Sequence, residues 1–190
     1  SGSGGTGTAG LQIADALGAS HIVTTAGNHS VASLLRKLGA DTIFNYHTQP
    51  LLESIADDSV DVFVDNFGYD ADIALQKVRV GGAFVTLTHE LPTTTKRGVR
   101  VVAVTCNASQ RADLDRLTSL VNTGKLRPVV DTTYAIGEAP QALRHSMSGG
   151  TVGKLALAIG GAVGMHGFHP EQSFGRAVAA RGRHAKHAMI

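Results

Sequence analysis

The sequence predicts an α/β fold in which helices cover both faces of a doubly wound parallel sheet. Short β-branched runs alternate with patterns of helical period along the first 124 residues, as they do in βαβ units. One run, DVFVDNFG at 61–68, is nearly continuous in apolar residues, which is typical of a strand buried on both faces. At the start of the chain, a glycine-rich loop at 2–7 leads directly into a helical pattern.

Composition limits the class of protein. The chain has 190 residues, of which 43% are hydrophobic and 17% charged, so we expect a soluble domain with a substantial core. No apolar run approaches the ~20 residues that span a bilayer, so we expect no membrane span. The single cysteine, Cys106, excludes an intrachain disulfide and a multi-cysteine zinc site. We therefore expect a reducing compartment, the cytoplasm, with the mitochondrion as the alternative.

The positive charge lies at the end of the chain. The formal net charge is +2, but residues 161–190 carry four arginine and lysine residues against one glutamate, so residues 1–160 carry −1. A nucleic-acid function inferred from the isoelectric point would therefore depend on the tail alone, and we expect no nucleic-acid partner.

The alternation of patterns predicts the elements of residues 1–124, a dinucleotide-binding domain. The expected strands are HIVTTA (21–26), DTIFNY (41–46), DVFVDNFG (61–68), AFVTLT (83–88) and VRVVAVTC (99–106). Four helices are expected. The first covers about 6–18, and the second has an apolar face of Val31, Leu34, Leu35 and Leu38 and stops at Gly39. The third is marked by Ile73, Ala74 and Val78 and ends at Gly81-Gly82, and the fourth is capped by Ser109, carries an apolar stripe of Leu114, Leu117, Leu120 and Val121, and ends at Gly124.

The remaining residues divide into two parts. For residues 125–159, the pattern predicts three elements: LRPVVDTTYAI as an extended stretch, APQALRHSM as a short helix, and VGKLALAI as a final strand. Residues 160–190 show no sustained period, and we expect a basic, disordered tail with at most a short helix near 177–180.

The glycine loop, Gly2-Ser3-Gly4-Gly5-Thr6-Gly7, reads as G-x-G-x-x-G. In such a loop the first glycine permits a tight turn, the second lets the backbone approach a pyrophosphate, and the third lets helix and strand pack closely. The phosphates then lie on the free N–H groups at the positive end of the helix. The alternative is that SGSGG is a flexible linker joined to a helix.

The first strand that should precede this loop has no counterpart, because only Ser1 comes before it. We expect the Rossmann-type sheet to lack that strand, which exposes unpaired ladder groups at its centre. The chain should then be unstable, form a homodimer, or fill the gap with another strand.

The end of the second expected strand bears on the choice of cofactor. An NAD site usually has an acidic residue about 20 residues after the loop, but no acid occurs between Asp15 and Asp41. The small neutral donors at 24–30 suit a 2′-phosphate, so the sequence favours NADP(H) over NAD(H). The alternative is a turn followed by a helix cap at Asn28 or Ser30, and both interpretations can hold together.

Several motifs in order resemble the medium-chain dehydrogenase/reductase family, in particular its zinc-independent quinone-oxidoreductase-like branch. SGSGGTGTAGLQIADALGA is similar to the glycine loop of that branch, and RKLGADTIFNY, VDVFVDNFG and VGGAFVTL resemble the elements that follow. GKLRPVVDTTYAIGEAPQAL and SGGTVGKLALAI resemble its C-terminal stretch. The resemblance covers about residues 1–159.

The resemblance implies NADPH bound to the sheet and hydride transfer to a small-molecule quinone or enone. It places cofactor contacts at Ser3, Gly4, Gly5, Thr6, Gly7, Thr25, Asn28, His29, Tyr46, Asn66, Phe67, Thr86 and Thr88. Two departures are notable: Val31 stands where the family often has a lysine for the 2′-phosphate, and the N-terminal catalytic domain has no counterpart. The resemblance also implies that residues 125–159 return to complete that domain.

Other chemistry-bearing residues carry weaker signals. Three tyrosines are candidate proton donors, but a structural role is the favoured interpretation for each: Tyr46, Tyr69 and Tyr134. Cys106 is interpreted as a buried small hydrophobic residue. Asp65 and Asp70 are interpreted as loop carboxylates or helix caps. The pairs His166/His169 and His184/His187 are interpreted as unstructured histidines rather than metal ligands. We assign no catalytic residue. The alternative function is an inactive NADPH-binding or protein-interaction module, and a methyltransferase ranks last because it needs the missing acid.

Overall fold

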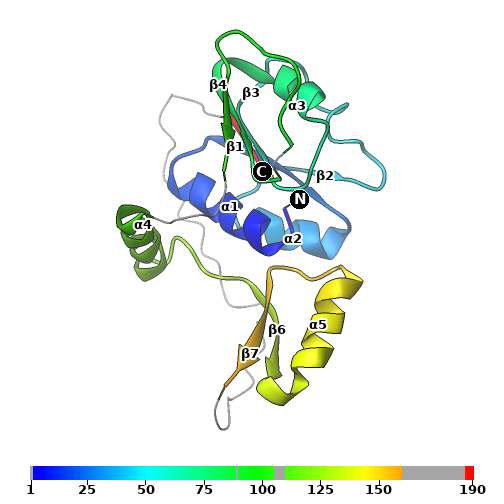
Figure 1. Cartoon of the computed structure of the whole chain (residues 1–190), viewed down its shortest axis with the longest axis vertical. Coiled ribbons are helices and arrows are strands. Elements are labelled where there is room, and N and C mark those ends of the chain that lie inside the picture. Colours follow the sequence, from blue (N-terminus) through cyan, green and yellow to red (C-terminus); the bar gives the residue numbers. More distant parts are fainter. Residues whose placement is uncertain (1, 89, 105–109, 160–186) are drawn as a thin grey trace.

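A computed structural model of the protein describes residues 2–88, 90–104, 110–159 and 187–190. Its body is a six-stranded parallel sheet in the order β2-β1-β8-β3-β4-β5, and β6 pairs with β7 in a separate parallel sheet (Figure 1). The elements are α1 (Gly5–Ala16), β1 (His21–Ala26), α2 (His29–Lys37), β2 (Thr42–Asn45), β3 (Val60–Asp65), α3 (Ala71–Lys77), β4 (Val78–Thr86), β5 (Arg100–Ala103), α4 (Arg111–Asn122), β6 (Val130–Ala135), a 3₁₀ turn (Ile136–Glu138), α5 (Ala139–Ser148), β7 (Lys154–Ala158) and β8 (His187–Met189). The predicted doubly wound α/β class is confirmed.

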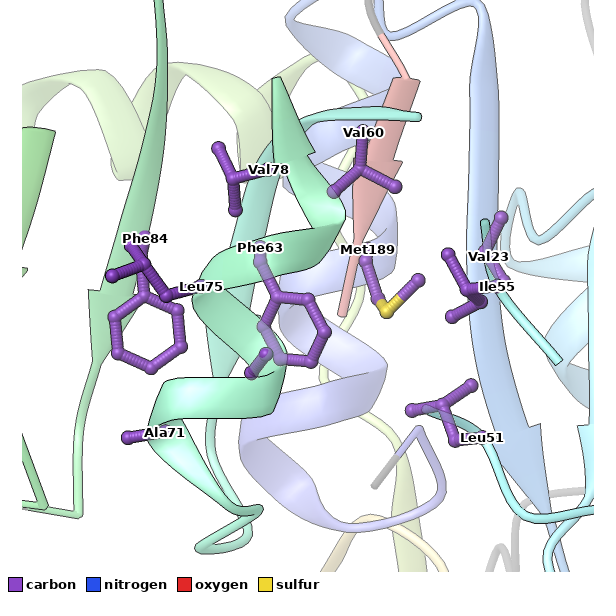
Figure 2. Close-up of a cluster of buried hydrophobic side chains, with 11 residues drawn as sticks. Val23, Leu51, Ile55, Val60, Phe63, Ala71, Leu75, Val78, Phe84 and Met189 are labelled. Atoms are coloured by element: carbon purple, nitrogen blue, oxygen red, sulfur yellow. The ribbon is translucent and has the colours of Figure 1, made fainter. Parts of the chain in front are cut away.

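Two buried clusters lie on opposite faces of the sheet. Neighbouring residues of one strand enter different clusters, as Ile22 and Val23 of β1 do, because side chains alternate along a strand. One cluster, shown in Figure 2, packs α3 against the sheet around Phe63, Phe84 and Met189. The other packs α1 and α2 against the opposite face. Residues of this second cluster are Leu11, Ala19, Ile22, Ala26, Leu35, Leu38, Ala40, Val129 and Ile190.

The boundary between α3 and β4 differs from the prediction. The helix ends at Lys77 rather than at Gly81-Gly82, and β4 already begins at Val78. Val78 pairs with Val60, and the register then shifts before Val62. Gly82 makes this close approach feasible, since a Cβ there would lie only 2.5 Å from the carbonyl oxygen of Asp61. Strand pairing therefore overrides the local helical spacing.

The predicted disordered tail is wrong for its last four residues. Residues 187–189 form β8, which lies in the middle of the sheet between β1 and β3 and runs parallel to both. In the usual doubly wound order 3-2-1-4-5-6, this central place belongs to the first strand. Of the three outcomes expected for the missing strand, the structure shows the gap filled by another strand. VGKLALAI is therefore not the final strand of the chain. Residues 160–186, with the helix expected near 177–180, lie outside the described residues.

The segment from β6 to β7 lies outside the large sheet. Figure 1 shows β6, β7 and α5 together as one small unit below α1 and α2. Helix α4 buries none of its residues, and its N-cap is Gln110 rather than Ser109, which lies outside the described residues. Across the described ranges, no helix is both long and apolar enough to cross a membrane.

Candidate cofactor site

The glycine loop ends at the N-terminus of α1, which is open. Gly4 is the N-cap residue, with extended backbone (φ −70°, ψ 171°), and it offers no side chain to the first N–H groups of the helix. A Cβ added at Gly4 would meet nothing within 4 Å. At Gly2, by contrast, a Cβ would lie 2.3 Å from Thr24 Oγ1, so this end of the loop packs directly on β1. The N-terminus of α1 can therefore accept an anion against its amides.

A lysine that sequence reasoning missed lies over this loop. The side chain of Lys154 covers Gly5, where an added Cβ would lie 2.2 Å from Lys154 Cε. The backbone holds the two segments together, because Gly153 N–H donates to Ser3 C=O at 2.8 Å and Gly4 bridges Gly153. Gly153 adopts φ +81° and packs on Val129 O, which favours glycine there. No local signal marks Lys154, which follows Gly5 by 149 residues.

The end of β1 carries the residues predicted near a 2′-phosphate. Thr25 is buried at 2% exposure, whereas Asn28 and His29 are exposed. Asn28 Oδ1 accepts from Val31 N–H at 3.0 Å, so the alternative interpretation of Asn28 as a helix cap is confirmed. Tyr46, after β2, lies against the same end, since a Cβ at Gly27 would lie 2.3 Å from the tyrosine hydroxyl.

The carboxyl ends of β3 and β4 meet beside this edge. Asp65 is fully buried, and its Oδ1 accepts from the N–H groups of Phe67 (3.0 Å) and Gly68 (2.8 Å). Thr88 Oγ1 lies 3.1 Å from Thr86 Oγ1 and donates to Asp65 Oδ2 at 3.5 Å. Asp65 thus ties the loop after β3 to the loop after β4, while Phe67 remains 66% exposed. Asn66, predicted as a contact, is part of the same loop.

Tyr69 extends this network to β1. Its hydroxyl shares a hydrogen bond with the Thr25 side chain, and its ring packs 5.2 Å from Phe67 and 6.1 Å from Phe63, measured between ring centroids. Burial, more than the nearby Asp65 charge, raises the pKa of the Tyr69 phenol above its usual value. The phenol is therefore a neutral hydrogen-bond donor over the physiological range.

Other candidates lie elsewhere. Asp70 caps α3, its Oδ1 accepting from Ile73 N–H at 3.0 Å. Tyr134 pairs with His145 at 2.8 Å between β6 and α5, away from the glycine loop. Cys106 and the histidines 166, 169 and 184 lie outside the described residues. Within the described ranges, no group of three or more His, Cys, Asp and Glu side chains is placed to hold a metal ion.

The structure thus brings the predicted residues to one edge of the sheet, at the carboxyl ends of β1, β3 and β4 and beside the start of α1. In doubly wound sheets this edge is where nucleotides bind. The arrangement combines amides and a lysine for phosphates with hydroxyls of Thr25, Thr86, Thr88 and Tyr69 farther along the edge.

Comparison with known proteins finds the same fold in oxidoreductases. A family model described as zinc-binding dehydrogenase matches residues 38–157. The NAD(P)H oxidoreductase RTN4IP1 of Danio rerio is 29% identical over 185 residues, covering 83% of this chain and 47% of that protein. The 2-methylene-furan-3-one reductase of Solanum lycopersicum is 31% identical over 159 residues, covering 82% and 38%. The chain therefore spans about half the length, or less, of these relatives.

A solved structure shows the likeness in three dimensions. The quinone oxidoreductase from Coxiella burnetii superimposes with a TM-score of 0.70 at 26% identity, over 84% of this chain and 51% of that protein.

Proposed function

Because the chain belongs to the medium-chain dehydrogenase/reductase family, we propose that it is the nucleotide-binding part of an oxidoreductase that binds NADPH and presents it to a quinone or enone. Curated relatives named as an NAD(P)H oxidoreductase and a furanone reductase support a reductase of this kind. An NADPH-dependent alkenal/one oxidoreductase of Arabidopsis thaliana, 36% identical over 131 residues, supports the choice of cofactor. The homodimer and the cytoplasmic or mitochondrial location stay predictions.

One observation carries the proposal: the N-terminus of α1 is open, and the neighbouring end of β1 has no acid. The glycine N-cap leaves the first amides of α1 to an outside acceptor, and Lys154 adds a positive charge beside Gly5. Asn28, His29 and Tyr46 supply polar groups, none of them a carboxylate, where an NAD site would place an acidic residue. The site therefore fits a cofactor with a pyrophosphate and a further phosphate.

The residues present have defined tasks in this proposal. When bound, NADPH supplies the hydride that reduces the acceptor. The α1 amides and Lys154 would hold the pyrophosphate, and Thr86, Thr88 and the loop of Asn66 and Phe67 would line the nicotinamide ribose. Asp65 keeps those two loops in register through its buried hydrogen bonds. The contribution of this chain is orientation, because it offers no group that we assign as a catalytic acid.

Among the described residues, no ligand set matches the zinc of the family's description. The whole sequence has one cysteine, and the described ranges hold no cluster of metal-ligating side chains. We therefore derive no step through a metal.

The test measures binding and turnover separately. Titration with NADPH and with NADH, followed by calorimetry, should show tighter binding of NADPH. Loss of nicotinamide absorbance with a quinone then measures turnover. Binding without turnover would assign this chain the cofactor-holding role alone, and absence of NADPH binding by the folded chain would refute the proposal.

A further inference from the structure

The centre of the sheet is formed by residues 187–189, which are far in sequence from the strands on either side. His21, Ile22 and Val23 of β1 pair with residues 187, 188 and 189, and on the other side Val62 and Phe63 of β3 pair with residues 188 and 189. The place between β1 and β3 is normally held by the strand that runs into the glycine loop. Here the loop and the strand occupying that place are separate segments, so the strand can be tested as a ligand of the sheet.

Side chains and backbone groups of the sheet bind both ends of this strand. At its start, Asp61 Oδ2 accepts from His187 N–H at 2.6 Å, and Asp61 also pairs with Arg79. At its end, Thr24 Oγ1 donates to the carbonyl oxygen of Ile190 at 2.5 Å, and Ile190 N–H donates to Val23 C=O at 3.0 Å. Thr24 and Asp61 are themselves buried, at 0% and 8% exposure. The slot thus holds polar anchors beyond the ladder bonds common to any strand.

The side chains of the strand fit two different surroundings. Met189, 1% exposed, points into the cluster of Phe63 and Phe84, as Figure 2 shows. Ala188 and Ile190 enter the opposite cluster under α1. Space at Ile190 is tight, since a Cβ at Gly10 would lie 3.0 Å from Ile190 Cγ2. The slot therefore selects a small residue followed by two large apolar ones.

The strand also contacts the supports of the glycine loop. Ile190 packs beneath α1 at Gly10 and shares a cluster with Leu11 of that helix. Thr24, which donates to Ile190, is the same residue on which Gly2 packs. An empty slot would remove Ala188 and Ile190 from the cluster that packs against α1.

We propose that the slot between β1 and β3 is a binding site for an extended apolar segment, that residues 187–190 of the same chain occupy it, and that occupancy sets the cofactor affinity of the glycine loop. Only the last clause rests on the proposed function. The 27 residues 160–186 can span at most ~90 Å when extended, so reach does not limit insertion within one chain.

The first experiment blocks the strand and then supplies it in trans. In the full chain, Met189→Asp places a carboxylate in the apolar cluster and should lower the melting temperature by about 10 °C or more, whereas Met189→Leu should change it by less than about 3 °C. A synthetic peptide of residues 185–190, AKHAMI, should restore the melting temperature of Met189→Asp. The same peptide with aspartate in place of methionine should not. A variant that melts like the wild-type chain, or equal effects of the two peptides, would overturn the inference.

The second experiment reports the position of the strand without relying on a destabilised variant. Gly10→Cys and Ile190→Cys, in a chain carrying Cys106→Ser, should form a disulfide within one chain, because a Cβ at position 10 lies in contact with residue 190. A monomeric band on a non-reducing gel, with the cross-linked peptide found by mass spectrometry, is expected. A disulfide between two chains would assign the strand to a second copy, and absence of the disulfide would place residue 190 elsewhere. Either result overturns the proposal.

Cofactor titration then tests the coupling. Met189→Asp should bind NADPH at least about 10-fold more weakly than the wild-type chain, with recovery on addition of AKHAMI, because fewer molecules hold the competent loop. Equal affinity would refute the coupling. If the chain with Gly10→Cys and Ile190→Cys forms the intrachain disulfide while the wild-type chain binds no NADPH, the proposed function is refuted and strand docking stays supported, so the two failures are distinguishable.

Discussion

Replacing Gly4 by aspartate should separate cofactor binding from stability. Gly4 is the N-cap of α1, its backbone is extended with negative φ, and a Cβ there meets nothing within 4 Å. Gly4→Asp therefore introduces no steric conflict, and an aspartate at this position can accept from the first N–H groups of α1. We expect the unfolding free energy to stay the same or to rise by about 0.5 kcal/mol.

The same carboxylate would stand where the pyrophosphate should bind. Two unit charges about 5 Å apart interact by about 3 kcal/mol at an effective dielectric constant of 20, which corresponds to a factor of about 100 in affinity. Gly4→Asn is the matched control, because it can make the same cap without the charge. It should weaken NADPH by about 10-fold at most, through competition for the amides.

The assay is calorimetric titration with NADPH at two salt concentrations, with a thermal melt of each variant. Raising the salt concentration should reduce the difference in NADPH affinity between Gly4→Asp and Gly4→Asn, since screening weakens charge repulsion more than it weakens hydrogen bonding. If Gly4→Asp binds NADPH as tightly as Gly4→Asn does, the pyrophosphate does not lie at this helix end, and our reasoning is wrong.

Three further predictions concern single contacts. Lys154→Met should weaken NADPH binding by about 10-fold. The control Lys125→Met, which removes another exposed lysine, should leave NADPH affinity unchanged. Equal effects of the two substitutions would exclude a direct contact of Lys154 with a phosphate. Gly27→Ala should displace the Tyr46 hydroxyl and weaken NADPH binding with little effect on melting, and the effect should vanish in a chain that also carries Tyr46→Ala. Asp72 accepts hydrogen bonds from Thr93 and Thr94, which lower its pKa to about 2. Because this folded-state pKa lies below the unfolded one, ionised Asp72 stabilises the folded state above about pH 4. That contribution is lost as the pH falls toward 2. Melting temperatures of Asp72→Asn should accordingly depend less on pH between 4 and 2 than those of the wild-type chain, and parallel curves would contradict the assignment.

Local patterns were sufficient for most of the sheet. HIVTTA forms β1 with the predicted bounds, because a β-branched apolar run between a helix stop and a cap has few alternative conformations. The glycine loop and its helix could likewise be predicted, since the G-x-G-x-x-G spacing and the helical period after it are local features of the sequence. Spacing failed at Val78, where pairing with Val60 favours a strand over one more helical turn.

For the candidate site, the sequence could predict residues at strand ends but not contacts between segments that are distant in the sequence. Residues at strand ends were predictable because parallel strands present their carboxyl ends to one edge. Lys154 was not, because it reaches Gly5 only through the backbone bridge between Gly4 and Gly153. The hydrogen bond of Tyr69 to Thr25 similarly joins the loop after β3 to strand β1, and no local pattern relates the two segments.

The order of residues was enough to predict the α/β class, the glycine loop that leads into α1 and the acid-free end of β1. These properties depend on periodicity, glycine geometry and charge, all of which act over short stretches of chain. Which segment forms the central strand between β1 and β3 was decided by tertiary structure. His187-Ala188-Met189-Ile190 is too short to carry a periodic signal, and it becomes a strand because the slot between β1 and β3 offers unpaired backbone groups, the anchors Asp61 and Thr24, and apolar space on both faces.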